Sequence, residues 1–305
     1  MTEEEFNELR PSAFAIAYRM LGSVSEAEDV VQEGFLRLHG AREGGDRIES
    51  PRAYLSTVVS RLSLDQLRSA RARRETYVGE WLPEPLVSSA DDDPARKAEI
   101  ADSLSLAFLV LLESLSPEQR AAFLLREVFD EPYDRIAEIV GTSEQNARQL
   151  ATRARRHVEE RRPRFEASRE QREQLTTRFF AAAEEGDLEG LEELLAHDVV
   201  FRGDGGGKAP AAARAVHGRV KVARLLIAGL RVVARVGGVT TRREEVNGQP
   251  GALFFDGEGR LISVAILDIA EGQIQAVSAI VNPDKLRHLG PVADLRALLR
   301  ERRHR

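Results

Sequence analysis

The apolar residues of this chain change their spacing about two thirds of the way along, and this change is the strongest constraint on its fold. In the first half they recur at helical intervals, as Val31, Phe35 and Leu38 do, which is typical of a helix with one buried face. In the last third they form short strand-like runs separated by the turn pairs Asn247-Gly248, Asp256-Gly257 and Glu271-Gly272. The sequence therefore predicts a multidomain chain that is all-α at first and α+β at its end.

Capping residues and prolines mark where the helices of the first half begin. We expect N-caps at Ser25, Ser50, Ser116 and Thr142. In the last third, the patterns predict helices around 166–185, 187–196 and 217–232, and strands at 198–203, 239–246, 252–256, 261–269 and 273–281. The short turns between the later strands favour a curved antiparallel sheet that wraps around the helices.

Prolines and serines at 81–86 and 91–94 interrupt the helical pattern and indicate a linker. The 305 residues are enough for two or three domains. We expect a first helical domain (1–75), a linker (76–100), a second helical domain (101–164), an α+β domain (165–286) and a basic C-terminal tail (287–305).

Composition excludes several kinds of site. The chain has no cysteine, which removes disulfides and thiolate chemistry, and its six histidines are scattered, so we expect no metal site. The N-terminus is acidic and polar, unlike a signal peptide. The longest apolar stretch, 225–239, is broken by Arg231 and Arg235. These features predict a cytoplasmic protein with no membrane span, no metal and no cofactor.

The formal net charge of −6 hides two strongly basic segments. The first contains Arg61, Arg68 and Arg71, and the second extends from Arg148 to Arg164. Phosphate binding depends on clustered cations rather than on the charge of the whole chain. The charge pattern therefore favours a nucleic-acid partner.

Residues 132–158 have the pattern of a helix-turn-helix, in which a short helix ends at Gly141. The second helix buries its alanines and exposes Gln and Arg, the side chains that read base edges through paired hydrogen bonds. An ordinary surface helix with a solvated basic face would show the same pattern. We expect base contacts from Arg148 and Gln149 and phosphate contacts mainly from Arg153, Arg155 and Arg156, with Gln145 on the same face.

The first half of the chain resembles the extracytoplasmic-function group of sigma-70 family RNA polymerase sigma factors. Residues 28–38 resemble region 2.2, which docks on core polymerase, and residues 53–68 resemble regions 2.3 and 2.4, which open and read the minus-ten element. The helix-turn-helix matches region 4.2, which reads the minus-thirty-five element. The resemblance implies DNA contacts by Arg61, Arg68 and Arg71, and polymerase contacts by Asp29, Gln32, Glu33 and Leu36.

The last third resembles the SnoaL-like cone fold of polyketide cyclases and ketosteroid isomerases. Sigma factors of one subgroup carry this extension together with three motifs. This chain has all of them: a WLPEP linker (Trp81, Leu82, Pro83, Glu84, Pro85), a DGGGK loop (Asp204, Gly205, Gly206, Gly207, Lys208) and an NPDKL tail (Asn282, Pro283, Asp284, Lys285, Leu286). The resemblance implies an initiation factor that binds core RNA polymerase and promoter DNA. It also implies control in cis by the cone, without a separate anti-sigma protein.

Other functions compete with this one. The cone could be a cyclase-like or isomerase-like enzyme, or a sensor of an unknown small ligand, fused to a DNA-binding module. Ketosteroid isomerases combine an acidic base with a tyrosine-containing oxyanion hole. Carboxylates are present at Asp198, Asp204 and Asp268, but all four tyrosines lie outside 165–286, so we expect no catalytic residue. A free-standing helix-turn-helix regulator is the other alternative, although it has no use for a region 2.2-like face.

The large apolar side chains of the WLPEP linker need cover, since an exposed aliphatic side chain forgoes roughly 1.5–3 kcal/mol of burial energy. The flanking helices could provide that cover. We favour docking on the cone, near 204–208 and 282–286, because three successive glycines let another backbone approach closely. In that position Lys208 or Lys285 could pair with Glu84 or with linker carbonyls.

Overall fold

The computed structural model describes residues 2–74, 76–87, 105–160 and 168–301, which form two compact units. The first unit combines Met1–Thr76 with Phe108–Arg162, and the second combines Tyr77–Ala107 with Pro163–Arg305. The start of the predicted linker thus belongs to the same unit as the α+β part. The rest of that linker, the arginines at 161–164 and the last four residues lie outside the described residues.

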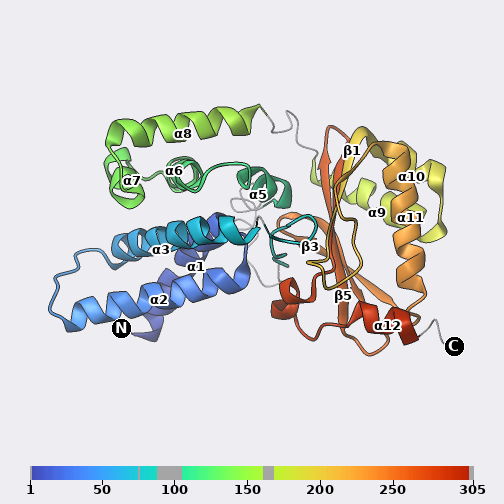
Figure 1. The fold of residues 1–305 in the computed structure, drawn as a ribbon, viewed down its shortest axis with the longest axis horizontal. Coiled ribbons are helices and arrows are strands. Elements are labelled where there is room, and N and C mark those ends of the chain that lie inside the picture. The colour runs from blue at the N-terminus through green and yellow to red at the C-terminus, as the bar shows by residue number, and fades with distance from the viewer. Residues whose placement is uncertain (1, 75, 88–104, 161–167, 302–305) are drawn as a thin grey trace. The chain divides into compact units, whose positions relative to one another are not determined.

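The first half of the chain is all-α, as predicted. Its helices are α1 (Glu3–Leu21), α2 (Val24–Glu43), α3 (Pro51–Arg74), α5 (Leu106–Leu112), α6 (Pro117–Glu127), α7 (Tyr133–Val140) and α8 (Glu144–Glu159) (Figure 1). The predicted capping box at Ser116 is confirmed. Two predicted caps are wrong. Ser23 caps α2 instead of Ser25, and its hydroxyl accepts from the amide of Glu26.

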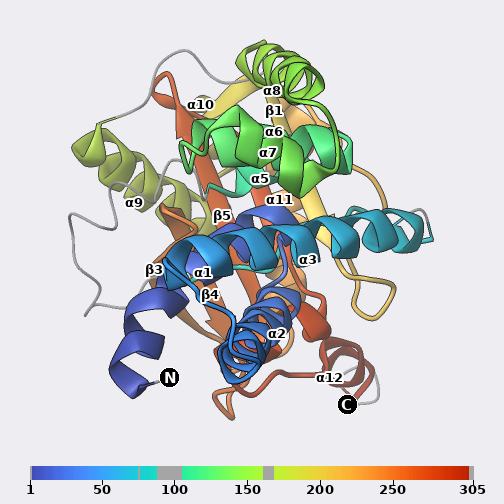
Figure 2. The same ribbon diagram turned by 90° about the vertical axis from the view of Figure 1, so that its left-hand side faces the viewer.

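The second wrong cap is at α8, where Ser143 replaces the expected Thr142 and accepts from the Asn146 amide. Within the first unit, α1, α2 and α3 pack together, and α6, α7 and α8 form a second group. The two groups also contact each other, because α3 lies against α6 and α7 (Figure 2).

A buried arginine joins the two groups of helices. Arg120 on α6 is 2% exposed, and its Nε and Nη2 donate to the carbonyl of Arg19 near the end of α1, at 3.3 and 2.9 Å. Its Nη1 pairs with Glu113. Burial lowers the pKa of Arg120 to about 9, so the guanidinium is still cationic at neutral pH. A buried cation needs all its partners, and Arg120 therefore holds α6 against α1.

The second unit is α+β, as predicted, with a six-stranded sheet in the order β2-β1-β6-β5-β4-β3. Its strands are β1 (Leu195–Asp204), β2 (Val216–His217), β3 (Thr240–Val246), β4 (Gln249–Phe255), β5 (Leu261–Ala270) and β6 (Gln273–Ile280). Its helices are α9 (Arg169–Glu185), α10 (Leu188–Leu194), α11 (Arg219–Ala234) and α12 (Leu295–Glu301), with short 3-10 turns η1 (Pro283–Lys285) and η2 (Arg287–Leu289).

The expectation of a wholly antiparallel sheet is wrong, because β1 and β6 run parallel. Short turns dictate only the pairing of strands that follow one another, whereas β1 and β6 are far apart in sequence. Two predicted turns are confirmed. Asn247 and Gly248 have φ of 52° and 69°, and Glu271 and Gly272 have φ of 54° and 71°. Two successive positive φ angles are typical of the type I′ hairpin turn.

The cone core lies between the sheet and α9, α10 and α11 (Figure 1). It also includes Ala293 and Leu295, which the sequence placed in a separate tail. The main chain of Leu261 bonds to this segment on both sides, donating to Pro291 and accepting from Ala293 at 2.8 and 2.9 Å. The expectation of a tail beginning at residue 287 is therefore wrong for the described part, since its apolar residues complete the core.

Arg120→Met should destabilise the first unit by roughly 3 kcal/mol, because it leaves Glu113 and the Arg19 carbonyl without their buried donor. Arg37→Met is the matched control. Arg37 is half exposed, and among the described residues it pairs along α2 with Glu33, so its loss should cost less than about 1 kcal/mol. Urea unfolding of the full chain, followed by circular dichroism, measures both. Equal midpoints for the two variants would contradict the role of Arg120.

Candidate functional sites

The helix-turn-helix is formed by α7 and α8, joined through Gly141 in the left-handed conformation (φ 77°). α8 buries Ala147, Ala151, Ala154 and Val158. Outside that buried face, α8 exposes all of its residues that the sequence assigned to DNA: Gln145, Arg148, Gln149, Arg153, Arg155 and Arg156. The predicted orientation of the helix is confirmed, and contact of these residues with DNA stays a prediction.

The arginines of α8 differ in how they are held. Arg148 pairs with Glu144 and lies 4.4 Å above the ring of Tyr133, a cation–π contact that orients its guanidinium. Arg155 pairs with Glu127 across the helices. Among the ion pairs of the described residues, none involves Arg153. The Arg148 side chain is therefore preoriented, whereas the Arg153 side chain can adjust its conformation to the position of a phosphate.

The predicted minus-ten residues lie on α3 beside the second helical domain. Arg61 pairs with Glu138 at 2.8 Å, and Arg68 pairs with Glu118 at 3.0 Å. Arg71 belongs to α3, but its side chain lies outside the described part of the structure. The α3 arginines thus meet acidic side chains of α6 and α7 in this arrangement, at the positions that the sequence assigned to DNA.

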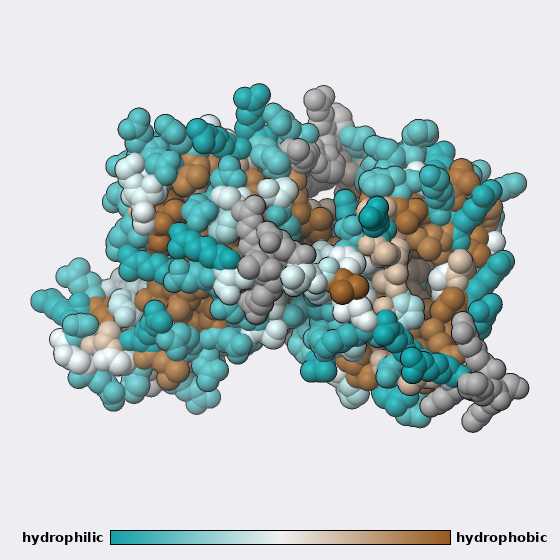
Figure 3. Space-filling model, viewed as in Figure 1, coloured by the Kyte–Doolittle hydropathy of each residue, from teal (hydrophilic) through white to brown (hydrophobic). Residues whose placement is uncertain are grey.

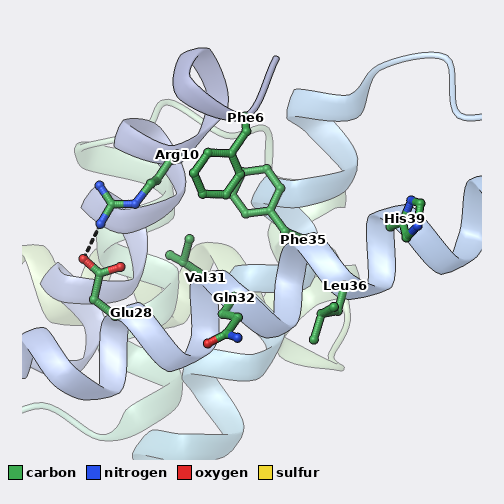
Figure 4. A pocket seen from close by; sticks show the side chains of 8 residues that line it. All are labelled: Phe6, Arg10, Glu28, Val31, Gln32, Phe35, Leu36 and His39. Atoms are coloured by element: carbon green, nitrogen blue, oxygen red, sulfur yellow. Dashed lines mark hydrogen bonds and ion pairs between the residues drawn. The ribbon is translucent and has the colours of Figure 1, made fainter. Parts of the chain in front are cut away.

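The region 2.2-like face of α2 borders an open groove of about 590 Å³. Leu36 is 59% exposed and projects beside Gln32 at its edge (Figure 4). Asp29 is exposed and Glu33 half-buried on the same helix. Phe6, Val31 and Phe35 line the same groove, and an apolar patch rimmed by polar side chains is typical of a protein-binding surface.

The sequence did not show that α1 forms the other wall of this groove. Phe6 of α1 packs on Phe35 with ring centroids 4.6 Å apart, and Arg10 pairs with Glu28 at 2.5 Å (Figure 4). Nothing in the local pattern distinguishes Phe6 from an ordinary core residue. Its role depends on the packing of α1 against α2.

In the second unit, the linker segment 77–87, here named the strap, is anchored by the Asp204 carboxylate at the end of β1. Asp204 is fully buried and accepts four hydrogen bonds. Tyr77 Oη and the Gly206 amide donate to Oδ1 at 2.5 and 3.1 Å. The Leu82 amide and Lys285 Nζ donate to Oδ2 at 2.9 and 2.6 Å. One carboxylate therefore joins the strap, the 204–208 loop and the 282–286 tail.

Lys285 completes this anchor from the tail. Its buried ammonium also donates to the Leu82 carbonyl and lies 4.1 Å from the Trp81 ring centroid and 5.0 Å from that of Tyr77. Burial, followed by the neighbouring Asp204 carboxylate, raises the pKa of Tyr77, so the phenol stays protonated as a donor. The predicted pairing of Lys285 with a linker carbonyl is confirmed. Lys208 pairs with Asp284, and the interactions between described residues include none between Lys208 and the strap.

The glycines of the loop allow the strap to approach. Gly206 has φ of 55°, and a Cβ atom there would lie 2.2 Å from Nδ2 of Asn282. Gly207 has φ of 68°, and its Cβ would lie 3.2 Å from Cβ of Val78 on the strap. Any side chain at these positions would strain the backbone and displace the neighbouring segment. The predicted close approach is confirmed.

The rest of the strap continues along the sheet. Leu86 donates its amide to Oδ1 of Asn247 at 3.0 Å and accepts from the amide of Asn247 at 2.7 Å. His288 contacts the Pro85 carbonyl at 2.8 Å, and the Ala215 amide donates to Glu80 at 3.1 Å. Within the strap, the residues from Leu82 to Pro85 are buried. The strap, which is the described part of the linker, therefore docks on the cone, as the sequence favoured.

The carboxylates that could serve an enzyme do not meet in one place. Asp198 is exposed, and Asp204 is occupied by the strap. Burial raises the pKa of Asp268, and Arg202 opposes the shift, but its neighbours along β5 belong to the core, so Asp268 points to the opposite face of the sheet. The expectation that no tyrosine reaches the cone is wrong, because Tyr77 arrives through the strap.

Within the described residues, no group of His, Asp and Glu side chains is arranged to hold a metal ion. The described helices include none with the length and apolar character needed to cross a membrane.

Comparison with known proteins identifies the two helical domains and the whole chain. Residues 6–73 match the model of sigma-70 region 2, and residues 105–158 match that of sigma-70 region 4. The chain is 41% identical over 296 residues to the ECF RNA polymerase sigma factor SigJ of Mycobacterium tuberculosis, with 93% of each chain covered. It is 36% identical to the probable ECF RNA polymerase sigma factor SigI of that species, over 89% of this chain and 90% of the relative.

The fold agrees with the sequence comparison. The crystal structure of the extracytoplasmic function sigma factor SigJ of M. tuberculosis matches with a TM-score of 0.75 at 38% identity, and covers 94% of this chain and 98% of that chain. The similarity thus includes the helical domains and the α+β cone together. On this basis the chain belongs to the family of extracytoplasmic-function RNA polymerase sigma factors.

Proposed function

We propose that this sigma factor directs promoter-specific initiation through three surfaces. The α2 face around Leu36 binds core polymerase, the α3 arginines act at the minus-ten element, and α8 reads the minus-thirty-five element. Membership of the family supports this division, and the exposure of Leu36 and of the α8 side chains supports the choice of residues.

Initiation then requires the two helical domains to separate. The two promoter elements lie about 25 bp apart, which is roughly 85 Å along B-form DNA. In the first unit the domains touch directly, through Arg61 with Glu138, Arg68 with Glu118, and buried Arg120. We infer that this arrangement is a closed state of the free factor, in which acidic side chains occupy the α3 arginines.

Control in cis depends on the strap in this proposal. It lies between the two helical domains in sequence, and Asp204 and Lys285 hold it on the cone. A linker fixed along a third domain allows fewer arrangements of the domains it connects than a free linker does. The cone therefore sets how readily regions 2 and 4 reach both promoter elements together.

The cone in this proposal is a regulator and not an enzyme, and the scattered carboxylates support that choice. A regulator built into the chain also removes the need for a separate anti-sigma protein. The factor acts in the cytoplasm, where polymerase and promoter DNA are available.

Leu36→Ala should lower the affinity for core polymerase about tenfold or more, because a large apolar anchor at an interface is worth at least about 1–2 kcal/mol. The fold should be unaffected, since Leu36 is exposed. Val220→Ala removes another exposed aliphatic side chain, on the cone, and serves as control. Titration of labelled sigma factor with core enzyme measures both. Equal affinities for the two variants would disprove the α2 assignment.

Arg148→Ala should change the sequence preference at one promoter position, by roughly 1–3 kcal/mol of discrimination. Arg153→Ala should instead weaken binding to all DNA sequences alike. It should also reduce the salt dependence of the affinity by the contribution of about one phosphate contact. Selection of binding sites from random DNA by the holoenzyme, repeated at two salt concentrations, separates these effects. An unchanged preference with Arg148→Ala would remove it from the base-reading set.

Lys285→Met should release the strap, because Asp204 would keep a buried negative charge without its cation. Trp81, the single tryptophan, should then become several-fold more accessible to acrylamide, and the yield of run-off transcript should change. Lys208→Met is the control, since its pair with Asp284 is exposed. Unchanged Trp81 quenching in Lys285→Met would refute the anchor. Changed quenching with unchanged transcription would refute the regulatory role.

A further inference from the structure

The cone contains a long segment of one charge. Residues 205–243 include nine lysines and arginines and no aspartate or glutamate, although the whole chain carries a net charge of −6. This segment contains α11 and was not among the basic stretches that pointed to DNA. It belongs to the second unit, outside both helical domains.

Three of these cations form a line on α11, and a fourth, the C-cap residue Arg235, continues it. Lys221, Arg224, Arg231 and Arg235 are separated by three, seven and four residues, which places them on one face of a helix. All four are exposed. At 1.5 Å per residue they span about 21 Å. We name these residues the α11 stripe.

The stripe faces solvent because the other side of α11 is fixed in the cone core. Val222, Ala223 and Ile227 are buried there. In Figure 3, hydrophilic side chains project along the edge of the cone beside α11. The charged face is therefore held in one orientation.

The helices that contact α11 are α9 and α10, and both carry acidic side chains, such as Glu184 on α9 and Glu189 on α10. The ion pairs between described residues include none that involves a member of the stripe. Glu193 is 4.0 Å from Arg178 of α9 instead. The stripe thus keeps its cations available for an anionic partner.

We propose that the α11 stripe binds the phosphate backbone of duplex DNA and gives the cone its own, sequence-independent DNA contact. The proposal rests on the proposed function, which brings promoter DNA to this chain. A rigid line of cations over about 21 Å matches a row of backbone phosphates, and lysine and arginine contacts to phosphate need no base sequence.

Chain connectivity keeps the cone within reach of that DNA. α8 ends at Glu159 and α9 begins at Arg169, so ten peptide units join the DNA-reading helix to the cone. Fully extended, they span at most about 36 Å. A duplex held by α8 therefore passes within reach of the cone.

The packing of α11 argues against a membrane as the anionic partner. A helix that binds a lipid surface inserts its apolar face next to the basic one. The apolar face of α11 is already buried in the cone, at Val222 and Ile227. Val220 on the same helix is 43% exposed, but a single valine does not supply the apolar face that insertion needs.

The test measures binding of the full chain to a fluorescein-labelled duplex of mixed sequence, about 30 bp long, by anisotropy at several salt concentrations. The double variant Arg224→Gln, Arg231→Gln should reduce the magnitude of the salt slope by about 1.8. Equivalently, the affinity lost between 50 and 200 mM salt should be about twelvefold smaller than for the wild type. The reporter of the proposed function in the same assay is Arg153→Gln, on α8.

The matched control is Arg178→Gln, Arg242→Gln, which removes the same charge from exposed cone residues that already pair with acids. It should keep the wild-type slope. An unchanged slope for the stripe variant, or an equal loss in the control, would overturn the proposal, as would a wild type that fails to bind the duplex at 50 mM salt. A smaller salt slope with Arg153→Gln but not with the stripe variant would agree with the proposed function and contradict DNA binding by the stripe.

Phosphatidylserine vesicles are the second probe, in a sedimentation assay at the same salt concentrations. The proposal expects weak vesicle binding that the stripe variant does not alter. Vesicle binding that depends on Arg224 and Arg231 while duplex binding does not would assign the stripe to a membrane and overturn the DNA contact.

Discussion

A carboxylate that no water reaches needs donors for its lone pairs, and Asp204 obtains its four from its own loop and from two distant parts of the chain. The strap supplies Tyr77 and Leu82, the loop supplies Gly206 and the tail supplies Lys285. Removing one partner of a buried ion pair costs about 3–5 kcal/mol, far more than an exposed pair contributes. The contacts among strap, loop and tail are therefore made and lost together. The linker is then either docked on the cone or undocked, as in a two-state element.

Local chemistry was enough to predict much of the fold. Asn247-Gly248 tolerates positive φ at both positions and Gly272 at its own, and the spacing of the flanking apolar residues then predicts both hairpins locally. The helix caps were predicted to within one or two residues, because Ser23 and Ser25 are equally good acceptors and only the packed helix selects one. The parallel pairing of β1 with β6 and the burial of Ala293 were missed, since both depend on contacts between distant segments.

The same limit applies to the candidate sites. Docking of the linker near the glycine loop could be predicted, because large apolar side chains need cover and glycines permit approach. The sequence offered Lys208 and Lys285 equally as partners of the linker. Only the structure, in which Lys285 is 7% exposed, identifies Lys285 as the anchor. Tyr77 was set aside with the other tyrosines because it lies outside 165–286, yet its hydroxyl reaches Asp204. A lone tyrosine beside a proline-rich segment carries no signal of its own.

The distance along the chain between the two halves of the anchor has a consequence during synthesis. Lys285 follows Leu82 by 203 residues, and ribosomes add about 5–20 residues per second, so the strap waits roughly 10–40 s for its partner. Both helical domains leave the ribosome before the tail that completes the anchor. A nascent chain, or one terminated before Lys285, therefore presents regions 2 and 4 joined by a linker without its complete anchor, and the cone can control that linker only after Lys285 has been translated.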